Sequence, residues 1–268
     1  MANKKSSIIS IINQKGGVGK TTTTANLGHA LAQLGFKTLV IDFDPQANAS
    51  MVLGKLSPFE QPKTLADIYT SETTLYDCIT PTKYENLDLV SSHMDLFSIK
   101  IQITGTPDGI VGLKRSMDEK IISFYDFVLI DCQPDIGGAL VTNALVTSDY
   151  YIVPIAAEDV FGLRGIKQLE ASIKVIRDSL NPHISLIGAL ITMSDKRSNA
   201  TKVMTDMVTT YFKKENVFKT VIRRNAAINS AFLSNQTVFD FDKKTSGAED
   251  YIALGEELAK KLRKKPTL

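Results

Sequence analysis

Short runs of apolar, mostly β-branched residues alternate along the chain with longer segments in which apolar residues recur every three or four positions. The short runs are typical of strands, and the longer spacing is typical of amphipathic helices. Because the runs show little apolar–polar alternation, both faces of the resulting sheet should be covered. The expected strands are residues 7–13, 37–42, 87–91, 127–131, 150–154 and 186–193.

The clearest helical pattern covers residues 21–34, where leucines and alanines recur at helical spacing until Gly35. Two further helices are expected at residues 163–180 and 248–264. Strands that alternate with helices imply βαβ units. The predicted fold class is therefore α/β, a mostly parallel twisted sheet flanked by helices on both faces.

No internal repeat, low-complexity tract or Pro/Gly/Ser-rich linker interrupts the 268 residues, so we predict a single domain over residues 1–268. Residues 55–115 show the least clear periodicity of apolar and polar positions. Hydrophobic residues make up 43% of the chain and charged residues 22%, as in ordinary soluble proteins. This composition excludes a disordered or fibrous chain.

The net charge and the cysteine content exclude or limit several kinds of site and function. The net charge is +2, from 31 basic and 29 acidic residues, so any nucleic-acid site must be local. Cys78 and Cys132 form no CxxC pair, which argues against a disulfide framework or a zinc site and favours the cytoplasm. No apolar stretch approaches 18 residues, so no membrane span is expected.

A glycine-rich loop joins the first expected strand to the first expected helix. Glycines let backbone N–H groups surround an anion, and the helix N-terminus adds its dipole at the same point. Lys20 is spaced to reach the β- and γ-phosphates of a nucleotide, and the Thr21 hydroxyl is spaced to bind Mg²⁺. The alternative is a plain strand-to-helix turn. The predicted phosphate-binding residues are Gly16, Gly17, Val18, Gly19, Lys20, Thr21 and Thr22.

Carboxylates follow two of the expected strands. Asp42 and Asp44 end the second strand, and Asp131 ends the strand at 127–131. Ligands of open α/β sheets bind at the carboxyl ends of strands, so these groups should face the nucleotide. An aspartate in this position typically holds a Mg²⁺-bound water. Turn capping is the alternative for each aspartate, and Cys132 is expected to be a buried apolar filler.

The loop departs from the usual phosphate-loop pattern because Gln14 replaces the first glycine and a second lysine, Lys15, stands early. The string Lys15-Gly16-Gly17-Val18-Gly19-Lys20-Thr21 resembles the deviant Walker A family of ParA, Soj and MinD, which are P-loop ATPases. By this resemblance, Lys15 reaches across a dimer interface to the phosphates of the partner's ATP. The alternative is an ordinary solvent-facing lysine.

The string Asp42-Phe43-Asp44-Pro45-Gln46 also resembles the ParA group. The resemblance implies that Asp44 orients the attacking water and that Asp42 lies beside Mg²⁺. The implied catalytic residues are then Lys15, Lys20 and Asp44, and the implied metal residues are Thr21, Asp42 and Asp131. The segment after Asp131 reads Cys132-Gln133-Pro134-Asp135-Ile136-Gly137, where the family usually has a Pro-Pro-Ser-Leu-Gly type continuation.

The resemblance continues through the second half of the chain, at residues 153–158, 162–165, 190–193, 220–225 and 247–251. In the family, the segment matching 220–225 lies near the adenine, which implies a nucleotide-binding role for Asn225. Residues 231–236 depart from the family's usual Ala-Pro-Ser sequence.

Non-specific DNA binding needs several basic side chains aligned with phosphates and no reading of bases. Each candidate alone could be an ordinary solvated charge, but a dimer would double the group and strengthen its binding. The candidates are Lys196, Arg197, Lys202, Lys213, Lys214, Lys219, Arg223 and Arg224.

The resemblance predicts a DNA-partition ATPase that uses ATP and Mg²⁺ and is weak until stimulated. It would form an ATP-dependent homodimer on non-specific double-stranded DNA in the nucleoid, released by a ParB-like centromere-binding partner. The short N-terminus leaves no room for a helix-turn-helix domain. One alternative is a MinD-like membrane-associated positioning ATPase, although the basic tail after Leu262 lacks bulky apolar anchors. Others are a dethiobiotin synthetase-like ligase and a nitrogenase-reductase-like protein, which needs a cysteine pair.

Overall fold

The computed structural model describes residues 6–71, 73–106, 109–159, 162–195 and 197–266. Within these ranges the chain forms a seven-stranded sheet of order β3-β4-β2-β5-β1-β6-β7. Neighbouring strands are parallel except for β3, which pairs antiparallel with β4 at one edge. The strands are β1 (Ser7–Ile11), β2 (Thr38–Phe43), β3 (Ile79–Pro81), β4 (Leu87–Val90), β5 (Phe127–Cys132), β6 (Tyr150–Ala156) and β7 (Ser185–Thr192).

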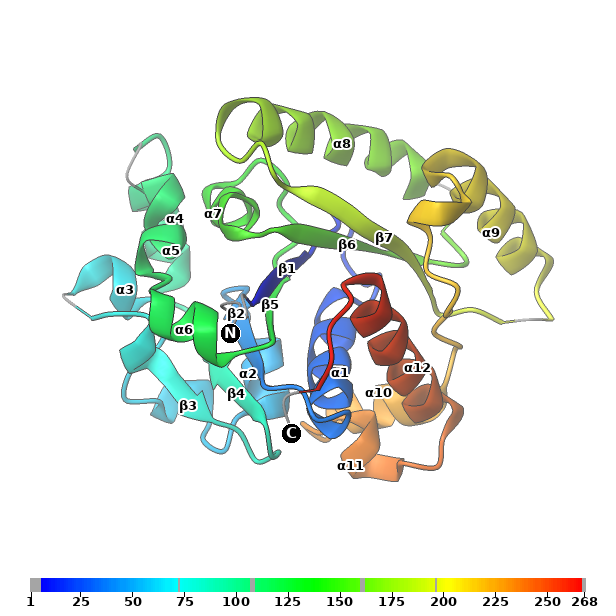
Figure 1. Ribbon diagram of the computed structural model, residues 1–268, viewed down its shortest axis with the longest axis horizontal. Helices are drawn as coiled ribbons and strands as arrows, with labels where there is room; N and C mark the ends of the chain where they lie inside the picture. The colour runs from blue at the N-terminus through cyan, green and yellow to red at the C-terminus, as the bar shows by residue number, and fades with distance from the viewer. Residues whose placement is uncertain (1–5, 72, 107–108, 160–161, 196, 267–268) are drawn as a thin grey trace.

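Helices cover both faces of the sheet (Figure 1). Two apolar clusters, one on each face, make up the core. The first face carries α1 (Lys20–Gln33), α2 (Asn48–Leu53), α10 (Ala226–Leu233), α11 (Val238–Asp242) and α12 (Ser246–Lys261). The second carries α3 (Asp67–Thr70), α4 (Leu96–Ile103), α5 (Gly112–Ser116), α6 (Glu119–Phe124), α7 (Ala139–Thr147), α8 (Gly162–Ser179) and α9 (Asn199–Phe212). Short 3-10 turns lie at Pro58–Glu60, Tyr76–Cys78, Gly109–Val111 and Lys214–Asn216.

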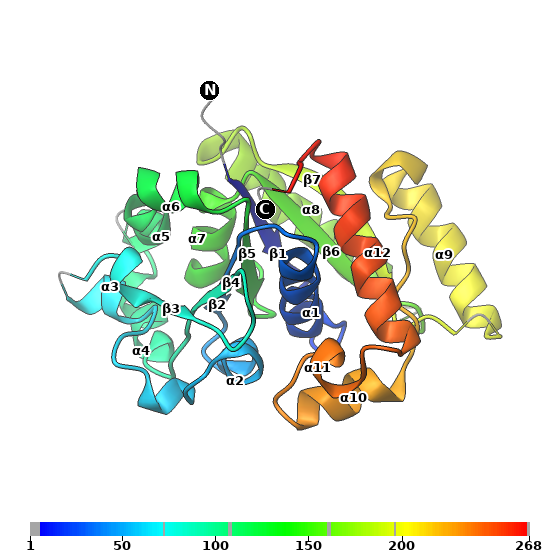
Figure 2. The ribbon, with the colours of Figure 1, turned by 60° about the horizontal axis from the view of Figure 1, so that its bottom comes forward.

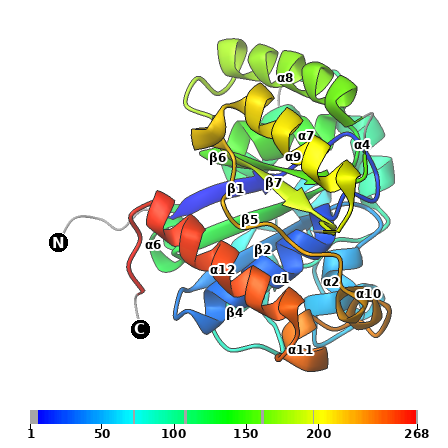
Figure 3. The same ribbon diagram turned by 90° about the vertical axis from the view of Figure 1, so that its right-hand side faces the viewer.

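The predicted fold class is confirmed, with the sheet enclosed between the two helical layers (Figure 3). All six predicted strands are present, and the three predicted helices are α1, α8 and α12. The edge strand β3 was not predicted, because it has only three residues and lies in the least readable part of the chain. That part folds into short helices, which show too few turns for a clear period. The single domain over residues 1–268 stays our interpretation.

Close packing holds α1 between the sheet and α12 (Figure 2). Gly28 of α1 lies against β2, where an added Cβ would come within 2.9 Å of Val40. Gly255 of α12 lies against the end of α1, where an added Cβ would be 3.0 Å from Leu34. Gly28 allows α1, which begins at the glycine-rich loop, to lie close to β2, and Gly255 allows α12 to lie close to α1. None of the helices in the described part of the chain combines the length and apolar character needed to cross a membrane.

A buried histidine on α1 makes the stability of the fold depend on pH. His29 is 8% exposed, stacks on Tyr84 at 3.9 Å, and its Nδ1 lies 2.7 Å from the Thr237 hydroxyl. Burial lowers the pKa of His29 to about 4, an effect that Lys83 strengthens and Asp240 opposes. The unfolded chain therefore binds a proton below about pH 6.5 that the folded chain does not bind until about pH 4.

We expect this difference to remove up to about 3 kcal/mol of stability as the pH falls from 6.5 to 4. Urea unfolding at pH 7.5 and pH 4.5 measures the loss. It should be smaller in His29→Asn, whereas His183→Asn, at an exposed histidine, should behave as the wild type. Equal pH dependence in wild type and His29→Asn would show that His29 is not the group responsible.

Candidate functional site

The glycine-rich loop between β1 and α1 has a geometry that only glycine adopts readily. Gly17 and Gly19 have φ angles of 73° and 87°, in the left-handed region that disfavours side chains. Gly19 directly precedes α1, so the free N–H groups of the first helical turn face the loop. Such a loop and helix N-terminus form an anion site suited to phosphate.

Contacts from other strands hold the loop in place. Asn13 Nδ2 donates to the Pro154 carbonyl of β6 at 2.8 Å, and its Oδ1 accepts from the Lys15 N–H at 3.0 Å. The Thr192 hydroxyl, at the end of β7, donates to the Val18 carbonyl at 2.9 Å. The loop is therefore preorganised by contacts with two neighbouring strands, β6 and β7.

The two lysines of the loop differ in environment. Lys20 is 7% exposed, and its Nζ donates to the Lys15 carbonyl at 3.0 Å, so its ammonium lies along its own loop. Burial lowers the pKa of Lys20, and the carboxylates of Asp131 and Asp44 oppose this shift. The Lys15 side chain is 53% exposed and reaches Asp159. One cation is thus held inside the loop and the other is directed outward.

The register of the sheet brings the predicted carboxylates together. Asp42 of β2 is the paired neighbour of Asp131 of β5, and Asp44 follows two residues later. Burial raises the pKa of Asp42, and hydrogen bonds from Ser50 oppose the shift. Burial also raises the pKa of Asp131 well above its usual range, with the Asp42 charge as the next cause. Three adjacent carboxylates need a cation to stay ionised together.

Asp131 fits a role in holding Mg²⁺. Its Oδ1 accepts from the Thr24 hydroxyl at 3.1 Å. Its Oδ2 is buried and has no hydrogen-bond partner among the described residues. No group of three or more His, Cys, Asp or Glu side chains in the described ranges encloses one metal position. Mg²⁺ at nucleotide sites is commonly held by phosphates, water and one or two protein groups.

Two serines that the sequence analysis missed position the carboxylates. The Ser50 hydroxyl donates to Asp42 Oδ2 at 2.7 Å and accepts from the Ser92 N–H at 2.9 Å. The Ser92 hydroxyl donates to the Asp44 carbonyl at 2.6 Å. Ser92 follows β4, the strand beside β2. Its position directly after a strand is the sequence feature that could have identified it, because the carboxyl ends of parallel strands lie at the same edge of the sheet.

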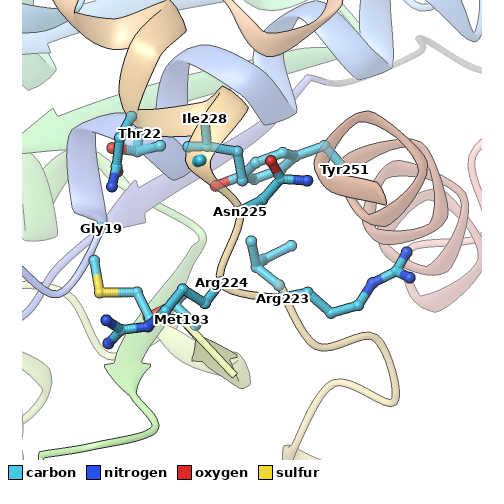
Figure 4. Close-up of a pocket in the computed structure, with 12 residues that line it drawn as sticks. Gly19, Thr22, Met193, Arg223, Arg224, Asn225, Ile228 and Tyr251 are labelled. Atoms are coloured by element: carbon cyan, nitrogen blue, oxygen red, sulfur yellow. The ribbon is translucent and has the colours of Figure 1, made fainter. Parts of the chain in front are cut away.

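A cavity of about 310 Å³ opens beside the loop, and Figure 4 shows its lining side chains. Its size and mixed lining suit a planar base. Asn225 caps α10: its Oδ1 accepts from the Ala227 N–H at 2.8 Å, and its Nδ2 donates to the Ser246 hydroxyl at 2.8 Å. The lining residues are Gly19, Thr22, Thr192, Met193, Ile222, Arg223, Arg224, Asn225, Ala226, Ile228, Asn229 and Tyr251.

The segment that departs from the family pattern forms a tight turn after β5. Asp135 makes an ion pair with Lys100 of α4. Gly137 has a φ angle of 95°, and a Cβ on Gly138 would come within 2.4 Å of the Asp135 carboxylate. Asp135 therefore ties this turn to α4, and the glycines permit it.

The predicted DNA-binding residues are not gathered in one place. Arg223 is held by Asp250 and Glu249, and Arg224 pairs with Glu158, so both arginines have acidic partners. Their side chains point in opposite directions (Figure 4). Arg197, at the start of the α9 region, pairs with Asp195, while Lys202 is exposed on α9. Lys196 lies outside the described residues.

The other three candidates lie together. Lys213, Lys214 and Lys219 are exposed on the segment between α9 and α10. Lys214 and Lys219 line a shallow cavity of about 500 Å³ with Lys260 and Lys261 at the end of α12. The DNA-binding residues predicted from the sequence do not include the lysines at the end of α12. Tertiary packing adds these lysines to the predicted group.

Comparison with known proteins finds relatives that match nearly the whole length of this chain. A family described as an AAA domain matches residues 6–186. The sporulation initiation inhibitor protein Soj of Bacillus subtilis is 37% identical, covering 94% of this chain and 98% of that protein. The chromosome partitioning protein ParA of Myxococcus xanthus is 34% identical, covering 95% and 88%. A cobyrinic acid a,c-diamide synthase structure from Mycobacterium smegmatis, with bound ADP and magnesium, has a TM-score of 0.83 at 26% identity, covering 96% of each chain.

Proposed function

Since this chain belongs to the ParA, Soj and MinD family of P-loop ATPases and uses ATP and Mg²⁺, we propose that it is a DNA-partition ATPase. It forms an ATP-sandwich homodimer that binds non-specific double-stranded DNA in the nucleoid. A ParB-like partner stimulates hydrolysis and releases the dimer. Its relatives in Bacillus subtilis and Myxococcus xanthus carry the names Soj and ParA.

The main support for the proposal is that the ammonium groups of the two loop lysines point in different directions. Lys20 lies along its own loop, whereas the Lys15 ammonium projects away from it. A lysine beside a phosphate site whose ammonium does not contact its own loop can contact the phosphates bound by a second chain. Two chains facing each other would then each supply a cation to the other's triphosphate.

The remaining site residues divide among phosphate binding, metal binding and hydrolysis. The loop from Gly16 to Thr22 surrounds the phosphates, and Lys20 neutralises charge on the β- and γ-phosphates. Thr21, Asp42 and Asp131 hold Mg²⁺ directly or through water. Asp44 orients the water that attacks the γ-phosphorus, and the base occupies the cavity beside Asn225. Phosphoryl transfer needs mainly such positioning and charge neutralisation.

The DNA surface centres on the lysines between α9 and α10 and at the end of α12. Lys213, Lys214, Lys219, Lys260 and Lys261 belong to this group. Glu215, Glu256 and Glu257 lie among these five lysines, and the Glu257 carboxylate accepts hydrogen bonds from the N–H groups of residues 219 and 220. The excess of lysines suits a polyanion. The ion-paired Arg223 and Arg224 are weaker candidates, because DNA must compete with their acidic partners.

A triple Lys213→Ala, Lys214→Ala, Lys219→Ala variant tests this surface. We expect it to retain ATP hydrolysis and to bind DNA more weakly in the presence of ATP. In a salt titration, the slope of log affinity against log salt concentration should fall by about 3 per chain. A matched variant at three exposed lysines elsewhere, Lys55, Lys63 and Lys114, should bind DNA as the wild type does.

Co-sedimentation of the wild type with DNA or with anionic phospholipid vesicles, using ATP, ADP or no nucleotide, tests the function as a whole. Binding to DNA with ATP alone is the expected result. Binding to vesicles but not to DNA would overturn the proposal in favour of the MinD-like alternative.

A further inference from the structure

The outward-facing lysine of the loop is held by one aspartate on a distant segment. Lys15 Nζ lies 2.5 Å from Asp159 Oδ1. Asp159 follows β6 in the connection to α8, 144 positions along the chain from Lys15. Its N–H donates to the Ala156 carbonyl at 3.0 Å, which folds the connection back toward the loop.

The two ends of this ion pair differ in exposure. The Lys15 side chain is 53% exposed, whereas the Asp159 side chain is only 8% exposed. The pair of Lys174 and Asp178 on α8 has the same 2.5 Å separation, but its side chains are 73% and 55% exposed. Exposed pairs contribute little, because water replaces the lost partner. A carboxylate with little access to water gains less from such replacement, so losing its cation costs more than at an exposed pair.

The proposed dimer requires Lys15 to leave this contact. When its ammonium moves to the phosphates of a second chain, the shielded Asp159 carboxylate loses the only cation that it contacts among the described residues. The phosphates must therefore compete with Asp159 for the lysine. ATP competes better than ADP for the Lys15 ammonium, because ADP lacks the negatively charged γ-phosphate.

We infer that Asp159 is a positioning residue that holds Lys15 within its own chain until the triphosphate of a second chain displaces it. This inference rests on the proposed function, since it describes how dimer formation is controlled. The tether opposes dimers that lack ATP, and it makes the γ-phosphate the group that releases the lysine.

Asp159→Asn tests the tether in an Asp44→Ala background, which blocks hydrolysis. With Mg·ATP, light scattering should show a dimer dissociation constant about tenfold lower than in Asp44→Ala alone, equal to about 1.4 kcal/mol. Dimers should also become detectable with ADP. Asp178→Asn, in the same background, makes the same charge change at the exposed pair and should shift neither result.

A second measurement does not depend on dimer formation. In the nucleotide-free protein, acylation of Lys15 by an N-hydroxysuccinimide ester, followed by mass spectrometry, should be several-fold faster in Asp159→Asn than in Asp178→Asn. Asp159→Glu, which keeps the charge, should stay near the wild-type rate.

The two measurements separate the possible failures. If Asp44→Ala never dimerises with Mg·ATP, the proposed function is wrong, and the acylation rates still decide whether the tether exists. If Asp44→Ala dimerises but Asp159→Asn matches Asp178→Asn in both measurements, the tether is wrong and the proposed function stands.

Discussion

Lys15→Ala should bind ATP as a single chain and fail to dimerise. The side chain is directed away from its own loop, so its removal should leave the phosphate contacts proposed for Lys20 and the loop N–H groups in place. A hydrogen bond to a charged group contributes about 1.5 to 3 kcal/mol, and each dimer would lose two such contacts. We therefore expect dimerisation to weaken about 10²- to 10⁴-fold, measured by light scattering with Mg·ATP.

A fluorescent ATP analogue measures nucleotide binding to the same variant at concentrations where both proteins are monomeric. Lys15→Arg keeps the positive charge and should dimerise better than Lys15→Ala. Lys167→Ala, at an exposed lysine of α8, controls for the loss of a surface charge. Normal dimerisation and DNA binding by Lys15→Ala would show that the cross-subunit role is wrong.

Asp44→Ala should block hydrolysis while the ATP dimer and its DNA complex persist. Asp44 is 9% exposed, and its Oδ1 accepts from the Gln46 N–H at 3.0 Å, so its carboxylate is oriented at the nucleotide edge of the sheet. Removing a group that orients or activates the attacking water typically slows the reaction about 10²- to 10⁴-fold. Nucleotide binding should not suffer, because the change removes one of three neighbouring negative charges.

Phosphate release in a single turnover measures this effect, and DNA co-sedimentation shows whether the complex persists. Asp44→Asn keeps the hydrogen-bond acceptor for Gln46 and loses only the charge, so similar slowing in both variants would assign the effect to the carboxylate charge. Hydrolysis at the wild-type rate in Asp44→Ala would mean that another group orients the water.

The phosphate loop could be predicted from the sequence because it is local. The glycines, Lys20 and Thr21 lie within a few residues of one another, so their spacing alone specifies a turn with free N–H groups. The carboxylates required one further rule, that parallel strands end at one edge of the sheet. The structure pairs Asp42 with Asp131, in agreement with that rule.

Contacts between distant segments could not be predicted in this way. The hydrogen bonds from the Ser92 N–H to the Ser50 hydroxyl and from the Ser92 hydroxyl to the Asp44 carbonyl depend on the order of β2 and β4 in the sheet. The position of Arg223 against Asp250 and Glu249 likewise depends on where α12 packs. Residues 55–115 hold short helices whose few turns give no period.

The sequence by itself determined the α/β class, the main strands and helices, and the phosphate chemistry of the loop, since each depends on periodicity or spacing within one segment. Tertiary structure alone decided the cavity beside the loop, the lysine group shared by two segments and the ion pair of Lys15 with Asp159. These features join residues far apart in the chain. The packing of helices on a particular strand order sets their distances, and residue spacing carries no information about that order.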